Sequence, residues 1–156
     1  MIIFGGNKNE SQKLSLIYKK HSRCKTKKHI FLSAESASLV KYAINSFLAT
    51  KVLFFNELFS IFEHLDTKDN WHDITNAVSE DIRIGASHMD VPGPDGRFGF
   101  GGACFPKDTT ALISFCRENN INLTVLETTV KTNNSIRSKY VDIDSREKDQ
   151  NIKFDF

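Results

Sequence analysis

The sequence is poor in cysteine and has no long apolar run. Its three cysteines, Cys24, Cys104 and Cys116, show no CxxC spacing, which argues against a disulfide framework and favours a reducing compartment. It contains no 18 consecutive apolar residues without a charge, and the opening MIIFGGNKNE lacks a basic segment followed by an apolar one. We therefore expect a cytoplasmic protein with neither a secretion signal nor a membrane span.

The chain also carries little excess charge. Its 21 basic and 19 acidic residues give a formal net charge of +2, which is too small to indicate a nucleic-acid or membrane partner. The basic stretch from Lys19 to Lys28 has the charge of a phosphate-binding patch, but it lacks interleaved aromatic residues and a known motif. We interpret this stretch as a solvated loop and expect no nucleic acid and no membrane among the partners.

What the chain does have is enough hydrophobic residues, 40% of 156, to bury the core of one domain. Short apolar runs predict strands at Met1–Gly6 and His29–Leu32, separated by a helix from about Glu10 to His21. Ser33 is suited to cap a long helix from Ala34 to Glu63, which contains neither Gly nor Pro. This pattern predicts a mainly α fold built around one long helix, with a small β element at the N-terminus.

The long helix is apolar around most of its circumference. Its own domain and a second copy of the chain are therefore expected to cover it, and a homodimer through this helix is the natural hypothesis. Shorter helices are predicted over Trp71–Ser79, Pro106–Glu118 and Thr124–Tyr140. Beyond Val141 the sequence is polar and unpatterned, which predicts a mobile tail.

The segment Val91–Asp108 is the densest candidate for a functional site. Five glycines and three prolines surround Cys104 there, and such a backbone can approach a ligand closely with its N–H groups available as donors. Cys104 precedes the predicted start of a helix, next to Lys107, and both features favour a reactive thiolate. The alternative is a buried structural thiol, which is how we interpret Cys24 and Cys116.

Polar residues on one face of the long helix form a second candidate. Lys41 and Asn45 are four residues apart, and Asn56 lies about three turns further along the same line. If buried, such groups need hydrogen-bond partners, so they mark a cavity or a polar seam. Taken alone, Lys41 is better explained as a surface residue whose extended side chain keeps its charge in water.

Together these segments resemble the UDP-glucose and GDP-mannose dehydrogenase family. The stretch SAESASLVKYAINSFLATKVLFFNE is similar to the family's central helix, and GFGGACFPKD is similar to its catalytic-cysteine motif. Between them, Asp81, Arg83, Ile84 and Gly85 match an arginine-containing turn. The resemblance extends from about Met1 to Tyr140. It implies that residues 33–141 form the family's central domain and that 1–32 are the end of its NAD-binding domain. Residues 142–156, which the resemblance does not reach, are the polar tail.

The resemblance also implies a reaction and a set of site residues. The family oxidises the C6 alcohol of a UDP-sugar twice, using two NAD equivalents and one water. Cys104 would form a covalent adduct with the aldehyde, and Lys41 and Asn45 would stabilise the oxyanion. Asp108 would assist proton transfer or orient the water. Arg83 would reach the partner subunit's substrate pocket. We expect no metal ligand, and the expected substrate-binding residues are Arg83, Arg97, Phe98, Gly99, Phe100, Gly101, Gly102 and Lys107.

The chain departs from the family in lacking its nucleotide-binding domains. No GxGxxG turn follows a strand, and Gly5-Gly6 is not that motif. We therefore expect NAD, the family's cofactor, not to be bound by this chain alone. Two hypotheses remain open. In the first, the chain is one piece of a dehydrogenase, either completed by a chain that supplies the missing domains or excised from a longer gene product. In the second, it is a non-catalytic remnant that dimerises, binds a sugar nucleotide or docks onto a full-length dehydrogenase.

Overall fold

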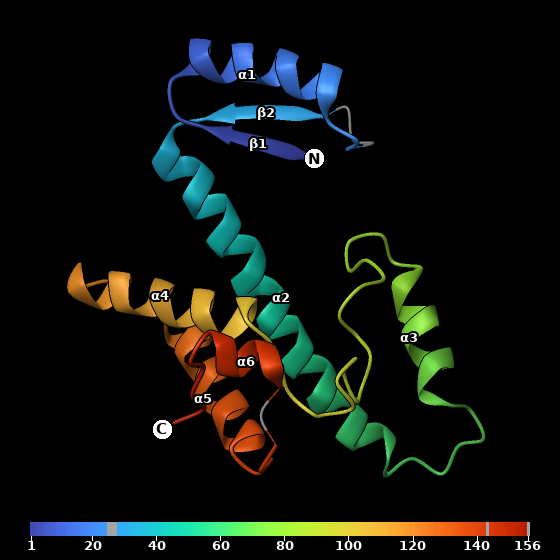
Figure 1. Ribbon diagram of the computed structural model, residues 1–156. Helices are drawn as coiled ribbons and strands as arrows, with labels where there is room; N and C mark the ends of the chain where they lie inside the picture. Colours follow the sequence, from blue (N-terminus) through green and yellow to red (C-terminus); the bar gives the residue numbers. More distant parts are fainter. Residues whose placement is uncertain (25–27, 143, 156) are drawn as a thin grey trace. The chain divides into compact units, whose positions relative to one another are not determined.

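The computed structural model describes residues 1–24, 28–142 and 144–155 and confirms the mainly α fold. The chain divides into two compact units, Met1–Ile44 and Asn45–Phe156. The long helix α2 (Ala34–Phe62) begins in the first unit and continues in the second (Figure 1).

The first unit contains a parallel strand pair joined by a helix. β1 (Ile2–Gly5) pairs with β2 (His29–Leu32), with Ile2 opposite His29 and Gly5 opposite Leu32. The connecting helix α1 (Lys8–His21) begins after Asn7, whose side chain caps it. Phe4 is buried on this small sheet and stacks on Phe31 with 5.8 Å between ring centroids. These strands form because short apolar runs pair and bury one face under α1.

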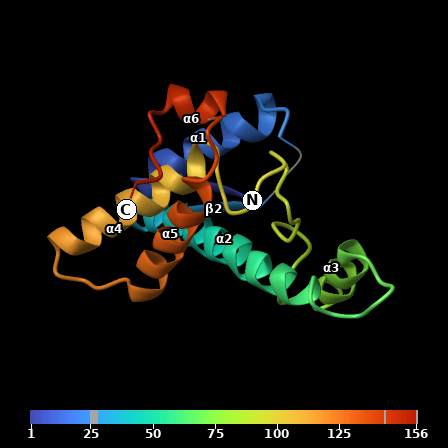
Figure 2. The same ribbon diagram turned by 90° about the horizontal axis from the view of Figure 1, so that it is seen from below.

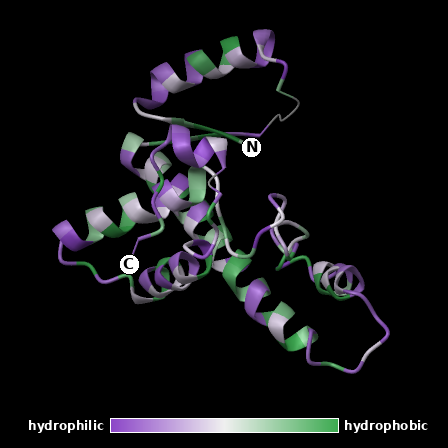
Figure 3. Ribbon diagram, turned by 60° about the horizontal axis from the view of Figure 1, so that its bottom comes forward, coloured by the Kyte–Doolittle hydropathy of each residue, from purple (hydrophilic) through white to green (hydrophobic). Residues whose placement is uncertain are grey.

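The second unit is helical. It holds most of α2, together with α3 (Trp71–Ser79), α4 (Cys104–Glu118), α5 (Thr124–Arg137) and the short α6 (Ser145–Asp149). The helices α4 and α5 form a helical hairpin (Figure 2). Hydrophobic residues recur along the second half of α2, as the green ribbon in Figure 3 shows.

Two hydrophobic clusters pack against α2 in this unit. The first contains Ala49, Leu53 and Phe100, with residues of α4 and α5 around them. The second contains Phe55, Met89 and Val91, with Trp71 of α3 packed against it. The Trp71 indole also donates a hydrogen bond to the Met89 carbonyl at 3.1 Å. The aperiodic segment between α3 and α4 is thus held along α2, and this segment carries the glycine-rich sequence.

The predicted elements agree closely with the observed ones. The bounds of β2 and α3 are those expected, and Ser33 caps α2 through a 3.2 Å hydrogen bond from the Ser36 N–H. The helix expected from Pro106 begins earlier, at Cys104, and the one expected to reach Tyr140 ends at Arg137. Of the basic stretch Lys19–Lys28, residues 25–27 lie outside the described residues.

The segment after Val141, which the sequence predicts to be an unpatterned and mobile tail, contains a helix that the sequence analysis did not predict. Residues 145–149 form α6, because Asp144 and Glu147 make a capping box at its start. Glu147 is only 1% exposed. The polar composition of this segment therefore does not mean that all of it is solvated. The Glu147 carboxylate is buried against charged and polar partners.

In the described part of the chain, no helix is both long enough and apolar enough to cross a membrane.

Candidate active site

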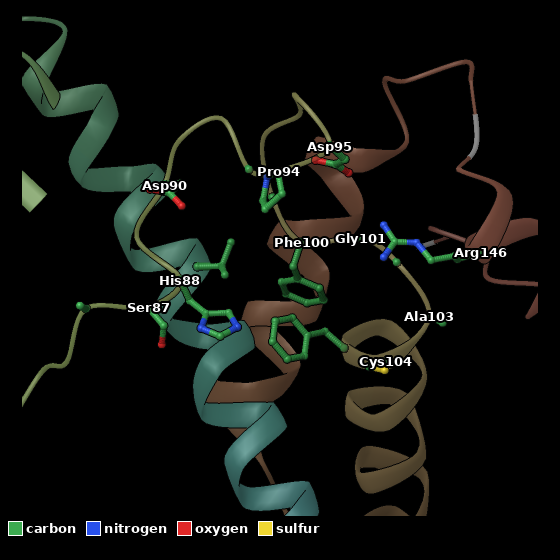
Figure 4. A pocket seen from close by; sticks show the side chains of 16 residues that line it. Ser87, His88, Asp90, Pro94, Asp95, Phe100, Gly101, Ala103, Cys104 and Arg146 are labelled. Atoms are coloured by element: carbon green, nitrogen blue, oxygen red, sulfur yellow. The ribbon is translucent and has the colours of Figure 1, made fainter. Parts of the chain in front are cut away.

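Cys104 is the first residue of α4 and lines a cavity of about 520 Å³. The cavity lies wholly within the second unit and is walled by the glycine loop, by the segment Ala86–His88, by Val52 of α2 and by Arg146 of α6. Figure 4 shows Cys104 at the start of α4, with Phe100 and His88 on the neighbouring walls. Cys104 is exposed, so the hypothesis of a buried structural thiol was wrong for this residue.

The other two cysteines differ from each other. Cys116 is buried, as expected of a structural thiol, whereas Cys24 is exposed, against that expectation. The position of Cys104 at a helix N-terminus places its sulfur where the backbone dipole favours a negative charge.

Asp108 lies one turn after Cys104 on the same face of α4. Its carboxyl group is almost fully buried, and Oδ2 accepts a hydrogen bond from Asn45 Nδ2 at 2.5 Å. Lys107 Nζ stands 3.9 Å from Asp108 Oδ1 and is half exposed. The Asn45–Asp108 hydrogen bond joins α2 to α4 across 63 positions of the sequence. The thiol of Cys104 lies one turn from that carboxyl group on α4.

The glycine loop, residues 97–102, is held by side chains that accept hydrogen bonds from its backbone. Tyr140 Oη accepts from the Phe98 N–H at 3.0 Å and Asn56 Oδ1 from the Gly99 N–H at 2.9 Å. Asn133 and Glu147 accept from Phe100 and Gly102, at 2.7 and 2.9 Å. The expectation that these N–H groups are available to a ligand was therefore wrong for four of them, because the protein's own side chains already use them.

The glycines of this loop are needed for close packing. A Cβ on Gly99, which has φ of +73°, would stand 2.6 Å from Asn133 Oδ1. A Cβ on Gly101 would collide with Arg137 Nη2 and Glu147 Oε1. These contacts leave no room for a side chain. The glycine-rich sequence is explained first by the buried polar groups beneath the loop.

A buried lysine, Lys51, holds another wall of the cavity. Its Nζ donates to the carbonyl oxygens of Ile84, Gly85 and Ser87 at 3.1, 2.8 and 2.6 Å. Burial lowers the pKa of Lys51 below its ordinary value. Because the three carbonyls belong to one turn, the ammonium group fixes the backbone that leads into His88.

His88 lines the cavity with backbone φ of +64°, a region that non-glycine residues seldom adopt. Its ring packs against Phe105, 5.5 Å between centroids. Burial and the charge of Lys51 lower the pKa of His88, and Asp90 partly opposes the shift. The folded protein therefore holds a neutral imidazole at neutral pH.

This lowered pKa predicts a pH-dependent contribution to stability. As pH falls below the unfolded-state value near 6.5, the unfolded chain binds a proton that the folded one resists, so stability is lost until the folded-state pKa is passed. His88→Asn, which tolerates the positive φ, should therefore show a smaller fall in melting temperature between neutral and mildly acidic pH than the unaltered chain. The exposed His72→Gln is the matched control and should leave the pH dependence as it was; equal curves for both variants would refute the prediction.

The remaining predicted site residues lie apart from the cavity wall or at its edge. Arg83 is exposed and forms a bidentate pair with Asp81, with Nη2 2.5 Å from Oδ2, which lowers the pKa of Asp81. The guanidinium of Arg97 lies over the Tyr140 ring at 5.3 Å. The Phe98 ring packs against Phe59, in the second hydrophobic cluster.

Lys41 is an exposed residue of α2 in the first unit. Its Nζ lies 5.4 Å from the centroid of the Tyr42 ring. Lys41 and Asn45 are four residues apart on one continuous helix, so they share a face of α2 as expected.

The sequence analysis did not identify the buried charged residues that hold the backbone around the cavity, namely Lys51, Arg137 and Glu147. Lys51 stands as a single charge in an apolar run, which gives no sign that it is buried. Arg137 and Glu147 were unassigned because their pairing spans two elements, although the spacing of Asp144 and Glu147 is a recognisable capping box. The described residues contain no cluster of three or more His, Cys, Asp or Glu that could hold a metal ion.

Comparison with known proteins decides the family. Residues 35–135 match the UDP-glucose/GDP-mannose dehydrogenase family, central domain. The chain belongs to this family. The family match includes Cys104, Asp108, Asn45 and Lys41 and ends before α6.

Relatives of the family align with most of this chain but extend well beyond it. A UDP-glucose 6-dehydrogenase of Rickettsia conorii is 35% identical over 141 residues, 90% of this chain and 31% of the relative. The UDP-glucose 6-dehydrogenase TuaD of Bacillus subtilis is 37% identical over 108 residues, 69% of this chain and 22% of the relative. The chain therefore spans less than a third of the length of these curated relatives.

A solved structure has the same fold. The UDP-glucose dehydrogenase from the archaeon Pyrobaculum islandicum superposes with a TM-score of 0.68 at 30% sequence identity. The likeness covers 85% of this chain and 28% of that one.

Proposed function

We propose that this chain supplies the catalytic cysteine and part of the sugar cavity of a UDP-glucose 6-dehydrogenase. The observation that carries the proposal is the exposed thiol of Cys104, at the N-terminus of α4 and on the wall of a cavity of about 520 Å³. A cavity of this volume is in the range of small-molecule sites. Membership of the family supports UDP-glucose as the substrate and UDP-glucuronate as the product.

In this proposal the thiolate of Cys104 adds to the C6 aldehyde carbon of the sugar. The carbonyl π pair moves to oxygen and gives a tetrahedral adduct with a negative oxygen, which needs hydrogen-bond donors. Asn45 Nδ2 donates a hydrogen bond to Asp108 through one of its N–H groups, and the second N–H is suited to donate to the oxyanion. We propose Lys41, on the same face of α2, as the cationic partner.

Asp108 would act in the hydrolytic half of the reaction. A thioester at Cys104 is cleaved when water adds to its carbonyl carbon and the thiolate leaves, and a carboxylate that orients the water and takes its proton assists this step. Asp108 is one turn from Cys104 and is held by Asn45. The substrate-binding roles of Arg83, Arg97, Lys107 and the loop residues Phe98–Gly102 remain part of the same proposal.

The hydride acceptor, NAD in this family, does not fit the N-terminus of α1. A dinucleotide site needs free N–H groups at the helix that follows its first strand. In α1, Asn7 Oδ1 already accepts from the N–H groups of Asn9 and Glu10, at 3.0 and 3.3 Å. Glu10 adds an acidic group to this first turn, so we assign to the chain only the steps at sulfur, oxyanion and water.

Complementation tests this proposal. The chain would be mixed with the separately produced nucleotide-binding domains of a UDP-glucose 6-dehydrogenase, and NADH formation from UDP-glucose and NAD followed by absorbance. We expect NADH only when chain and domains are both present. A folded chain that gives no NADH in any mixture would favour the alternative, a non-catalytic remnant that binds a sugar nucleotide or docks onto a full-length dehydrogenase.

We also propose that α2 forms a homodimer. Phe47, Phe54 and Ile61 are 64%, 54% and 59% exposed in the chain. They repeat every seven residues, so they form one stripe of the helix, and an apolar stripe of this kind is typical of a helix–helix interface.

The dimer hypothesis predicts that charge in this stripe separates the subunits. The double variant Phe47→Asp/Phe54→Asp should sediment as a monomer at concentrations where the unaltered chain is a dimer, because two carboxylates would be buried unpaired at the interface. The matched control is Phe115→Asp, since Phe115 is 59% exposed but lies on α4. Dissociation by the control alone, or a monomeric unaltered chain, would contradict the proposal.

A further inference from the structure

The C-terminal segment, Asp144–Asp155, places a carboxylate beneath the glycine loop. Glu147 Oε1 accepts from the Gly102 N–H at 2.9 Å and from Arg137 Nη2 at 2.7 Å. Glu147 Oε2 accepts from the Asp144 N–H at 3.1 Å. One side chain therefore joins α5, α6 and the loop that leads into Cys104.

The ion pair of Arg137 and Glu147 is excluded from solvent. The side chains are 0% and 1% exposed. Asp95, at the cavity, gives Arg137 a second carboxylate, with Nη1 2.7 Å from Oδ2. The rings of Tyr140 and Phe154 lie 5.7 and 5.4 Å from the guanidinium carbon. Since a buried charge is tolerated only when it is paired and hydrogen-bonded, this arrangement fixes Glu147 in one position.

The start of α4 depends on the loop before it. Its N-cap residue, Ala103, makes no side-chain hydrogen bond to the helix, so no capping side chain fixes Cys104 from within the helix. Gly102 immediately precedes this cap and has φ of +73°. The N–H of Gly102 is tied to Glu147, and Gly101 lies directly against the Arg137–Glu147 pair. The carboxylate thus fixes the backbone two residues before the thiol.

We propose that Glu147 is a positioning residue for Cys104, acting through the Gly102 N–H. This inference rests on the proposed role of Cys104 as nucleophile and adds to it, since residues 35–135 are the extent of the family match and Glu147 lies beyond them. The segment after the matched domain is thereby a structural part of the active site. Its second contribution is Arg146, which lines the same cavity.

A matched pair of double variants distinguishes positioning of Cys104 by Glu147 from the general stabilisation that the buried ion pair gives to the fold. Arg137→Met/Glu147→Gln and Arg137→Met/Glu147→Leu both remove the buried ion pair, but only the glutamine retains an oxygen that can accept from the Gly102 N–H. Both would be made in the full chain carrying Cys24→Ser, so that Cys104 is the one exposed cysteine among those described. The measurements are amide hydrogen exchange at Gly102 and alkylation of Cys104 by iodoacetamide at neutral pH.

We expect the leucine variant to exchange the Gly102 amide about tenfold faster than the glutamine variant, because the amide loses its acceptor. Cys104 should be alkylated about threefold more slowly in the leucine variant, since a frayed first turn weakens the dipole that favours the thiolate. Exchange at Ile113, further along α4, should be equal in the two. Glu118→Gln, an exposed carboxylate of α4, should change neither reading.

Equal Gly102 exchange and equal alkylation in the matched pair would overturn the inference. If the leucine variant does not fold, Glu147→Asp gives the same test, because the shorter side chain withdraws the carboxylate from Gly102 while keeping its charge; unchanged exchange there would also overturn it. Neither measurement needs NAD, substrate or turnover. A failure of the dehydrogenase proposal is therefore distinguishable from a failure of this one.

Discussion

Replacing Cys104 with alanine is expected to lower formation of UDP-glucuronate in the complemented enzyme by about a thousandfold or more. The sulfur forms the covalent bond that keeps the aldehyde at the site, and alanine has no atom to replace it. The first oxidation, from alcohol to aldehyde, needs no covalent bond to sulfur. The variant should therefore lose the acid product more completely than it loses NADH. Chromatography of the nucleotide sugars, alongside NADH absorbance, measures both.

The control for this prediction is Cys24→Ala, since Cys24 is also an exposed thiol but belongs to the other unit. It should retain full activity, and Asn45→Ala should fall between the two because it removes a donor and also leaves Asp108 without that contact. Undiminished UDP-glucuronate formation by the Cys104 variant would remove the thiol from the mechanism. It would leave the binding or docking remnant as the better account.

Gly101→Ala is expected to reduce the free energy of unfolding by about 3 kcal/mol or more. The added methyl group would collide with Arg137 Nη2 and Glu147 Oε1, both buried. Relief requires either a shift of the loop or separation of a buried ion pair, and the second leaves an uncompensated charge. Urea denaturation followed by circular dichroism would measure the loss.

Gly102→Ala is the matched control for that substitution. Gly102 has φ of +73°, and a Cβ there would meet nothing within 4 Å beyond its chain neighbours. Alanine at this position therefore carries only the backbone cost of a left-handed conformation, about 1–2 kcal/mol. A larger loss for Gly102→Ala than for Gly101→Ala would show that backbone conformation, and not packing on the ion pair, explains the glycines of this loop.

Local sequence signals predicted the elements well because they depend on neighbouring residues. The period of apolar residues, the Ser33 cap and the absence of Gly and Pro define α2 almost to its ends. That Asn45 and Asp108 belong to one site followed only from the family resemblance, since they lie 63 positions apart, and their hydrogen bond was not predicted. No local signal could assign the carbonyl cluster around Lys51, because it depends on a turn more than thirty residues away.

For the segment after Val141 a local signal was present, the capping box of Asp144 and Glu147, but the polar composition outweighed it in the prediction. Low hydrophobicity after Val141 suggested that the segment buries too little apolar surface to offset the entropy lost when it becomes ordered. A single buried carboxylate changes that balance, because Glu147 meets a guanidinium, a loop amide and its own capping partner. Composition alone does not distinguish a solvated acidic residue from one that lies beneath a catalytic loop.

Three polar side chains on the part of α2 that belongs to the second unit each hold a different segment around the cavity. Asn45 holds α4, Lys51 the turn at Ile84–Ser87, and Asn56 the glycine loop through Gly99. Each residue of an α-helix advances the side-chain direction by about 100°. One extra residue between Asn45 and Lys51 would turn the latter two away from their segments while leaving the helix itself intact. The spacing of Asn45, Lys51 and Asn56 along one helix therefore determines how three segments that are distant in sequence are placed around the cavity.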